Sequence, residues 1–313
     1  MPFHPQVQQW RARRVIEGFT PLYAQSLAEA RAADLADIQA SSGTPEAVHE
    51  VSESSFAGRG GELPLRVFRP SAAEPLPALV YFYGGGWTLG QIATCDAICR
   101  TLANQVGCLV IAAGYRLAPE HPFPAAVQDC YDAVEWIAGQ AKELGIDDTR
   151  LAVGGDSAGG NLAAVTTLLA KRQGGPGLAA QLLIYPNTRY GADTDSMREN
   201  DDPSMFNRRS VDWYWAHYLA DPSDGLDPLA SPLLAEDLSE LPPALVITAE
   251  YDPLRDEAEQ YAQRLRADGV PTELSRYDGV MHGFFTMSGV LDSGRDAVSQ
   301  AADFLRAQFG LSR

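Results

Sequence analysis

Short apolar runs alternate with helix-forming segments along most of this chain, and this alternation limits its possible folds more than any other feature. Apolar runs at residues 79–83, 108–115, 181–186 and 244–248 are separated by stretches of helical composition. Strands joined by helices in this way form a mostly parallel sheet that is covered on both faces. We therefore predict an α/β fold. Its expected strands cover residues 51–56, 65–69, 79–82, 108–115, 151–154, 181–186, 244–248 and 272–277.

Two segments depart from the alternation. The N-terminal segment predicts two helices, the second with Thr20 as its N-cap and Pro21 in its first turn. Residues 187–232 form an irregular stretch that is rich in aromatic side chains. We expect a single α/β core built from residues 46–186 and 233–313, with the two other segments added to it.

Composition and charge exclude several classes of function. The chain has 313 residues, 45% of them hydrophobic, which is enough for one large core without metal or disulfide support. A formal net charge of −17 argues against nucleic acids and anionic membranes as partners. No apolar stretch approaches the ~20 residues needed to span a bilayer, and the first residues lack the basic-then-apolar order of a signal peptide.

The four cysteines give no indication of a metal site. Cys95 and Cys99 have helical spacing, and Cys108 and Cys130 follow within the same region, but no histidine is placed to complete a zinc site. We expect a cytoplasmic protein with reduced cysteines and no bound metal.

One serine lies in a sequence that is typical of a catalytic nucleophile. Residues 155–160 read Gly-Asp-Ser-Ala-Gly-Gly, between an expected strand and an expected helix. Glycines two residues before and two residues after Ser157 allow a turn tight enough to lift the hydroxyl above the sheet edge. The pattern Gly-x-Ser-x-Gly at a strand-to-helix switch is the nucleophile elbow of α/β-hydrolases, although glycine-rich turns also occur for packing reasons.

A serine hydroxyl needs a base, and the base needs an orienting carboxylate. Of the five histidines only His282 follows a late strand, and the functional residues of open α/β sheets gather at the carboxyl ends of strands. The loop after the preceding strand offers Asp252 as the favoured partner, with Glu250 and Asp256 as weaker candidates. Asp252 also fits the role of a helix N-cap. The order serine, aspartate, histidine is the one expected for this fold.

A run of glycines offers hydrogen-bond donors for an oxyanion. Residues 84–87 read Gly-Gly-Gly-Trp and follow the expected strand at residues 79–82. We expect the amides of Gly85 and Gly86 to supply two donors and Ala158, just beyond the nucleophile, to supply the third. A glycine run is otherwise simply a flexible turn.

Five motifs follow one another in a specific order. They read Tyr-Gly-Gly-Gly-Trp at 83–87, Tyr-Arg-Leu-Ala-Pro-Glu-His at 115–121, Gly-Asp-Ser-Ala-Gly-Gly at 155–160, Asp-Pro-Leu-Arg-Asp at 252–256, and His-Gly-Phe at 282–284. In this combination the chain resembles the bacterial hormone-sensitive-lipase family of carboxylesterases, from about residue 50 to the end. The resemblance implies an α/β-hydrolase core and a helical cap, here residues 1–45 and 187–232.

The resemblance also implies a mechanism without a cofactor. In that family the matching residues form the catalytic triad, here Ser157, Asp252 and His282. The matching oxyanion donors are the amides of Gly85, Gly86 and Ala158. The resemblance implies a structural role, not a catalytic one, for Glu120 and His121. Relatives often pair through the last strand of the sheet, so the resemblance implies a homodimer.

One position departs from the family pattern. Tyr83 stands where family members usually carry a histidine, which in that family braces the glycine loop. Tyr83 is therefore a candidate modulator of turnover, either by bracing the loop through its hydroxyl or by pointing inward and donating to the oxyanion.

The expected function is a serine carboxylesterase that hydrolyses small to medium acyl esters through an acyl-enzyme on Ser157. Tyr83 keeps open a biosynthetic enzyme of the same fold, such as an acyltransferase, lyase or epimerase. The other alternative is a receptor that binds a small molecule without turnover, and His282 beside an intact elbow counts against it. Aromatic residues are the candidate substrate contacts, with core packing an equally good interpretation; they are Phe19, Tyr23, Trp87, Phe206, Trp213 and Trp215.

Overall fold

The computed structural model describes residues 2–312 and contains a single eight-stranded sheet. The strand order is β1-β2-β4-β3-β5-β6-β7-β8, in which β2 pairs antiparallel with both β1 and β4 and all later pairs are parallel. The strands are β1 (Glu50–Gly58), β2 (Gly61–Arg69), β3 (Leu76–Phe82), β4 (Leu109–Ala113), β5 (Ile146–Asp156), β6 (Ala180–Ile184), β7 (Ala244–Tyr251) and β8 (Thr272–Met281). Each of the eight expected strands is present, with ends that differ by a few residues, so the α/β prediction is confirmed.

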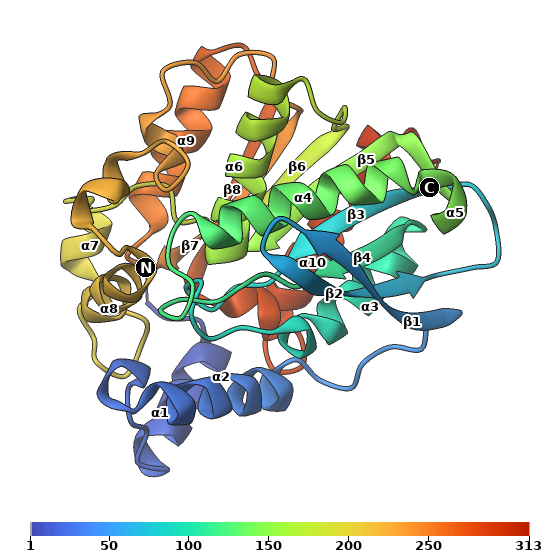
Figure 1. Cartoon of the computed structure of the whole chain (residues 1–313). Helices are drawn as coiled ribbons and strands as arrows, with labels where there is room; N and C mark the ends of the chain where they lie inside the picture. The colour runs from blue at the N-terminus through green and yellow to red at the C-terminus, as the bar shows by residue number, and fades with distance from the viewer. Residues whose placement is uncertain (1, 313) are drawn as a thin grey trace.

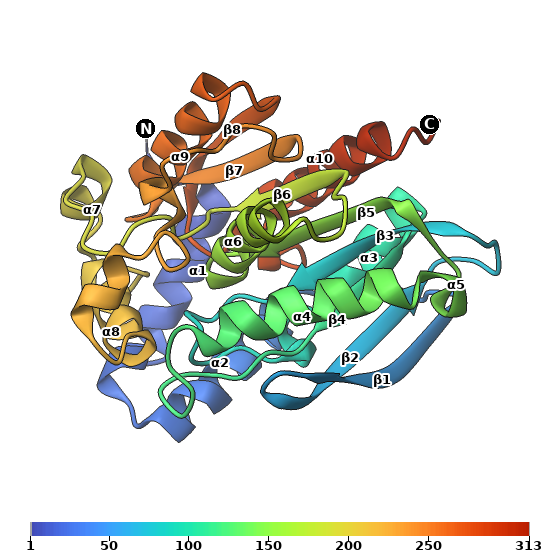
Figure 2. The same cartoon turned by 45° about the horizontal axis from the view of Figure 1, so that its top comes forward.

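Helices cover both faces of the sheet. They are α1 (Pro5–Ile16), α2 (Leu27–Ser41), α3 (Asp96–Val106), α4 (Ala125–Gly139), α5 (Ala141–Leu144), α6 (Ala158–Gln173), α7 (Asp195–Glu199), α8 (Arg208–Tyr218), α9 (Arg255–Ala267) and α10 (Asp292–Gln308). Helices α3 and α10 pack together on one face, and α4 and α6 pack together on the other (Figures 1 and 2). Every residue of the central strand β3 is buried, as expected for a strand covered on both sides.

The N-terminal segment corrects one prediction. Its second helix, α2, starts at Leu27 rather than near Pro21. Ser26 is the N-cap: its side chain accepts from the amide of Glu29, and the Glu29 carboxylate accepts from the amide of Ser26. This reciprocal capping box satisfies two amides at the helix start. Residues Thr20 and Pro21 instead lead into the short 3₁₀ turn Leu22–Ala24, with Pro21 in an extended conformation.

Helices α1 and α2 lie on the same side of the molecule as α8, which comes from the aromatic-rich stretch (Figure 1). A small apolar cluster joins α2 to α8 through Ala30 and Tyr214, with Leu22 and Phe206 packed against it. Two segments far apart in the sequence therefore meet. We keep the division into core and cap as a prediction that this contact supports.

Other sequence expectations concern the cysteines and the sheet edges. All four cysteines are buried and free. None of the helices in the described chain combines the length and the apolar character that crossing a bilayer demands. Strand β8 forms one edge of the sheet, the edge at which the resemblance implies pairing between two copies.

Candidate active site

The turn between β5 and α6 holds Ser157 in a strained conformation above the sheet edge. Strand β5 ends at Asp156, α6 begins at Ala158, and Ser157 between them has φ 55° and ψ −118°. A positive φ is uncommon for a residue with a side chain and clusters at functional sites. A Cβ added to Gly155 would lie 2.4 Å from the carbonyl oxygen of Phe82, and one added to Gly159 only 1.9 Å from it. The two glycines are therefore needed where the elbow passes β3.

Ser157 and two distant side chains form one hydrogen-bonded series. The Oγ atom of Ser157 lies 2.9 Å from Nε2 of His282, and Nδ1 of His282 lies 2.7 Å from Oδ2 of Asp252. Asp252 is buried, and a carboxylate can only accept, so Nδ1 carries the proton. Nε2 is then free to accept the hydroxyl proton of Ser157. The structure thus brings together the three residues that the sequence singled out.

The backbone also fixes the direction of the Asp252 carboxylate. Its Oδ1 atom accepts a hydrogen bond of 2.8 Å from the amide of Leu254, which leaves Oδ2 for His282. Helix α9 begins at Arg255 and its N-cap is Leu254, so the prediction that Asp252 is the N-cap is wrong by two residues. The Asp252 carboxylate still accepts a hydrogen bond from the amide of Leu254, just before the helix.

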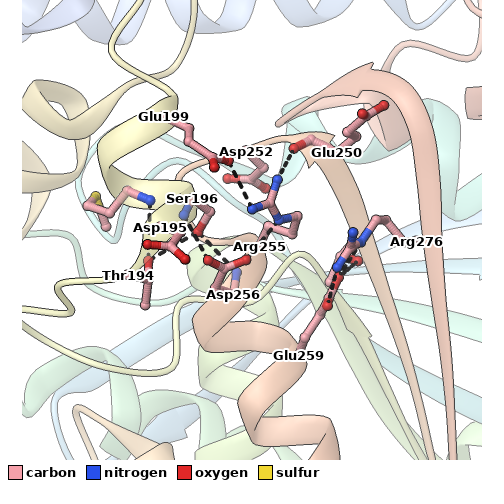
Figure 3. A network of polar contacts seen from close by, with 12 residues as sticks. Thr194, Asp195, Ser196, Glu199, Glu250, Asp252, Arg255, Asp256, Glu259 and Arg276 are labelled. Carbon is pink, nitrogen blue, oxygen red and sulfur yellow. Dashed lines mark hydrogen bonds and ion pairs between the residues drawn. The ribbon is translucent and has the colours of Figure 1, made fainter. Parts of the chain in front are cut away.

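The two weaker candidates for the carboxylate have other partners. Glu250 accepts a hydrogen bond of 2.7 Å from the amide of Gly279, and Asp256 accepts one of 2.7 Å from the amide of Ser196. Asp256 also forms an ion pair with Arg255 at 2.8 Å. Figure 3 shows this polar network around Arg255, with Asp256 turned toward the segment that contains Ser196.

The glycine loop after β3 presents free amides beside Ser157. Gly85, Gly86, Ser157 and His282 line the same cavity. Within residues 2–312, neither the Gly85 amide nor the Gly86 amide donates a hydrogen bond to another residue. Ala158 is the first residue of α6, where a helix leaves its amides without intrahelical partners and carries partial positive charge. These amides are chemically suited to hold a negatively charged oxygen.

Asp156 anchors this loop, a role that the sequence analysis missed. Its Oδ1 atom accepts a hydrogen bond of 3.1 Å from the amide of Gly84 and one of 2.9 Å from the hydroxyl of Tyr81. Burial raises the pKa of the Asp156 carboxyl to about 6, and the hydrogen bond from Tyr81 opposes that rise. The carboxylate thus prevails at neutral pH and ties the glycine loop to the elbow. Its adjacency to Ser157 was the only signal for it in the sequence.

Removing this anchor is expected to reduce turnover. We predict that Asp156→Ala lowers kcat by about 10²-fold, the effect of displacing one oxyanion donor, while KM changes little. Asp156→Asn keeps an oxygen acceptor for Gly84 and Tyr81 and should retain activity within about tenfold of wild type. Steady-state kinetics with a p-nitrophenyl ester separate the two parameters. Equal loss in both variants, or a loss confined to KM, would contradict the positioning role.

Tyr83 precedes the glycine loop and packs against Tyr115. Its ring stacks on Tyr115, with centroids 4.4 Å apart, and the hydroxyl of Tyr115 donates a hydrogen bond of 2.8 Å to the carbonyl of Tyr83. The hydroxyl of Tyr83 faces the backbone of Tyr115 at 3.4–3.5 Å and does not line the Ser157 cavity. Of the two expectations for this residue, the geometry supports bracing of the loop rather than donation to an oxyanion.

The Tyr83 hydroxyl should accordingly matter little to turnover. We expect Tyr83→Phe to change kcat/KM by less than about threefold, since contacts of 3.4–3.5 Å are weak hydrogen bonds and the stacked ring is kept. Tyr83→Ala removes the ring that stacks on Tyr115 beside the loop and should lower kcat/KM further. A large loss in Tyr83→Phe would mean that the hydroxyl acts on the reaction.

Two adjoining cavities contain four of the six aromatic candidates. The first, of ≈170 Å³, contains Ser157 and is lined in part by Phe206. The second, of ≈140 Å³, is lined by Phe19, Tyr23, Trp213 and Phe206 and shares His282 with the first. The ring of Phe206 stacks on the His282 imidazole at 4.1 Å.

The other two aromatic candidates, Trp87 and Trp215, follow the alternative interpretation, which is packing in the core. Both are buried in the core, with their rings 4.6 Å apart, and Trp87 stacks on Tyr218 at 4.0 Å. Neither lines the two cavities described above. Trp215 belongs to α8, so the contact between the two rings packs α8 onto the core. Tyr214, on the same helix, lines both cavities instead.

Comparison with known proteins identifies the family to which this chain belongs. The family model described as alpha/beta hydrolase fold matches residues 79–286. The carboxylic ester hydrolase LipN of Mycobacterium tuberculosis is 43% identical over 269 residues, which cover 84% of this chain and 72% of that protein. The structure of a hyperthermophilic esterase from Pyrobaculum calidifontis superimposes with a TM-score of 0.93 at 43% identity, covering 98% of this chain and 99% of the esterase. An ester-hydrolase from the metagenome of Lake Arreo, complexed with a bipyridine phosphonate derivative, gives 0.95 at 40% identity and the same coverage.

Proposed function

This chain is a carboxylic ester hydrolase of the alpha/beta hydrolase fold family, and from that premise we propose that it hydrolyses small to medium acyl esters through an acyl-enzyme on Ser157. The observation that carries this proposal is the unbroken series of hydrogen bonds from Ser157 through His282 to Asp252. The series ends in the same cavity as the free amides of the glycine loop.

In the first half of the reaction the enzyme is acylated. His282 Nε2 takes the hydroxyl proton while Ser157 Oγ bonds to the ester carbonyl carbon, whose oxygen becomes negatively charged. His282 then gives that proton to the alcohol oxygen as the carbon–oxygen bond breaks. The alcohol leaves, and the acyl group remains on Ser157.

In the second half water replaces the alcohol. His282 takes a proton from the water as its oxygen bonds to the acyl carbon, and then returns a proton to Ser157 Oγ as the carboxylic acid leaves. The buried Asp252 holds the ring orientation and stabilises the positive charge that His282 carries in each half. The amides of Gly85, Gly86 and Ala158 stabilise the oxyanion, aided by the dipole of α6.

Isotope labelling tests this assignment against the rival chemistries of the fold. In water enriched with oxygen-18 the acid product of a p-nitrophenyl ester should carry one labelled oxygen and the phenol none, because water attacks the acyl carbon. An acyltransferase would instead pass the acyl group to an added alcohol such as ethanol, even when the alcohol is much less concentrated than water. A lyase or epimerase would release no acid, and a receptor would release no product. Any of these three results, with folded protein, would contradict ester hydrolysis.

A further inference from the structure

One acidic side chain in the Ser157 cavity has no use in the mechanism. Asp34 lies in the middle of α2 and lines the cavity together with Ser157 and His282. Its Oδ2 atom is buried and has no hydrogen-bond partner among the described residues, although the residue as a whole is only half-buried. Within residues 2–312, Asp34 takes part in no ion pair. A carboxylate oxygen shielded from water in this way lowers stability unless a partner compensates it, so we look for its partner in a ligand.

The neighbouring charges leave this carboxyl uncompensated. Burial raises the pKa of Asp34 to about 7, and the negative charges of Asp156 and Asp37 add to the rise. Asp156 uses its Oδ1 atom to hold the glycine loop, as described above. No lysine or arginine is among the described residues that line the cavity. Both ring nitrogens of His282 are already hydrogen-bonded, one to Ser157 and the other to Asp252.

The arginine within α2 and the arginine of α1 that pairs with α2 are both engaged elsewhere. Arg31, one turn earlier on α2, donates two hydrogen bonds of 2.7–2.8 Å to Glu120 and a third to the carbonyl of Thr88. Arg14 pairs with Asp37 at 2.9 Å. The protein thus satisfies the other charges around α2 and leaves one carboxyl facing the place where the substrate binds.

We propose that Asp34 pairs with a cationic ammonium group on the substrate, so that this hydrolase prefers esters that carry an amine or a quaternary ammonium group. The inference rests on the proposed function, because it concerns the same cavity. Phe206 and Tyr214 line that cavity with aromatic rings, whose faces also attract ammonium groups. The net charge of −17 draws cations toward the molecule.

The test compares charged esters with uncharged esters of the same shape. One pair has the cation in the alcohol, namely acetylcholine and 3,3-dimethylbutyl acetate. The other pair has it in the acyl group, namely p-nitrophenyl esters of 4-(trimethylammonio)butyrate and 5,5-dimethylhexanoate. A quaternary ammonium does not titrate, so kcat/KM is measured at pH 8.5, where the Asp34 carboxyl is ionised. The readout is the kcat/KM of the charged ester divided by the kcat/KM of the uncharged ester of the same pair.

Asp34→Asn removes the charge and keeps the shape of the side chain. We expect it to lower the ratio at least tenfold in one of the two pairs, with the kcat/KM of the uncharged ester within about twofold of wild type. The matched control is Glu29→Gln, which removes a charge from an exposed position on the same helix and preserves the capping box with Ser26. It should leave both ratios unchanged.

The outcomes separate this inference from the function on which it rests. If wild type hydrolyses the uncharged esters but Asp34→Asn leaves both ratios within twofold, the ammonium preference is wrong and the esterase stands. An equal loss on charged and uncharged esters also overturns the preference, because it means that Asp34 supports the fold of the site. If wild type hydrolyses none of the four esters, both the inference and the proposed function fail.

Discussion

Replacing Ser157 with alanine is expected to lower kcat for p-nitrophenyl butyrate by about 10⁶-fold, the largest effect that any single change in this chain should have. The reason is that Ser157 Oγ lies 2.9 Å from the Nε2 atom of His282 and in the cavity next to the free amides of the glycine loop. Without it no acyl-enzyme forms, and only the slow direct attack of water remains.

The control for this prediction is a serine that lies outside the triad. Ser288 follows the His282 loop, and its hydroxyl donates a hydrogen bond of 3.1 Å to the carbonyl of Ser42. Ser288→Ala should keep kcat within about twofold of wild type. Both variants should keep the wild-type circular dichroism spectrum. Turnover by Ser157→Ala at more than about a hundredth of the wild-type rate would assign the nucleophile to another residue.

Asp252→Asn is expected to lower kcat by about 10⁴-fold while the fold stays intact. The asparagine oxygen can still accept the hydrogen bond that the amide of Leu254 gives to Oδ1. Its NH₂ group then faces Nδ1 of His282 and favours the imidazole tautomer that has the proton on Nε2. That tautomer cannot accept the proton of Ser157, so the nucleophile is not activated.

The two weaker carboxylate candidates serve as controls for this effect. Glu250→Gln and Asp256→Asn change carboxylates that hold the amides of Gly279 and Ser196 and do not contact His282. Each should keep kcat within about threefold of wild type, and any cost should appear in the melting temperature. If one of them lost as much turnover as Asp252→Asn, the orienting carboxylate would have been assigned to the wrong residue.

The parts of this fold that were predictable are those in which local sequence and burial agree. Parallel strands are buried on both faces, so β3, β6 and β7 appear in the sequence as short apolar runs. The elbow was recognisable because only glycine fits at residues 155 and 159, and His282 because of its place after the last strand.

The parts that were missed depend on contacts between distant segments. The start of α2 was misplaced because two N-cap signals compete, and the Ser26–Glu29 capping box satisfies more amides than Thr20 with Pro21. For Trp87 and Trp215 the sequence left cavity lining and core packing open, because the burial of an aromatic ring cannot be read from its neighbours in sequence. Asp34 gave no signal at all, since an aspartate in a helix normally faces water.

The most direct test of the triad is covalent labelling with an activated p-nitrophenyl phosphonate, which traps the nucleophile at the geometry of the oxyanion. We predict a single phosphonyl group, located on Ser157 by peptide mass spectrometry, with loss of esterase activity in proportion to labelling. Ser157→Ala should take up no label, and Asp252→Asn should be labelled much more slowly than wild type. A label on another residue, or full inhibition without a label on Ser157, would contradict the convergence of Ser157, His282 and Asp252 into one catalytic unit.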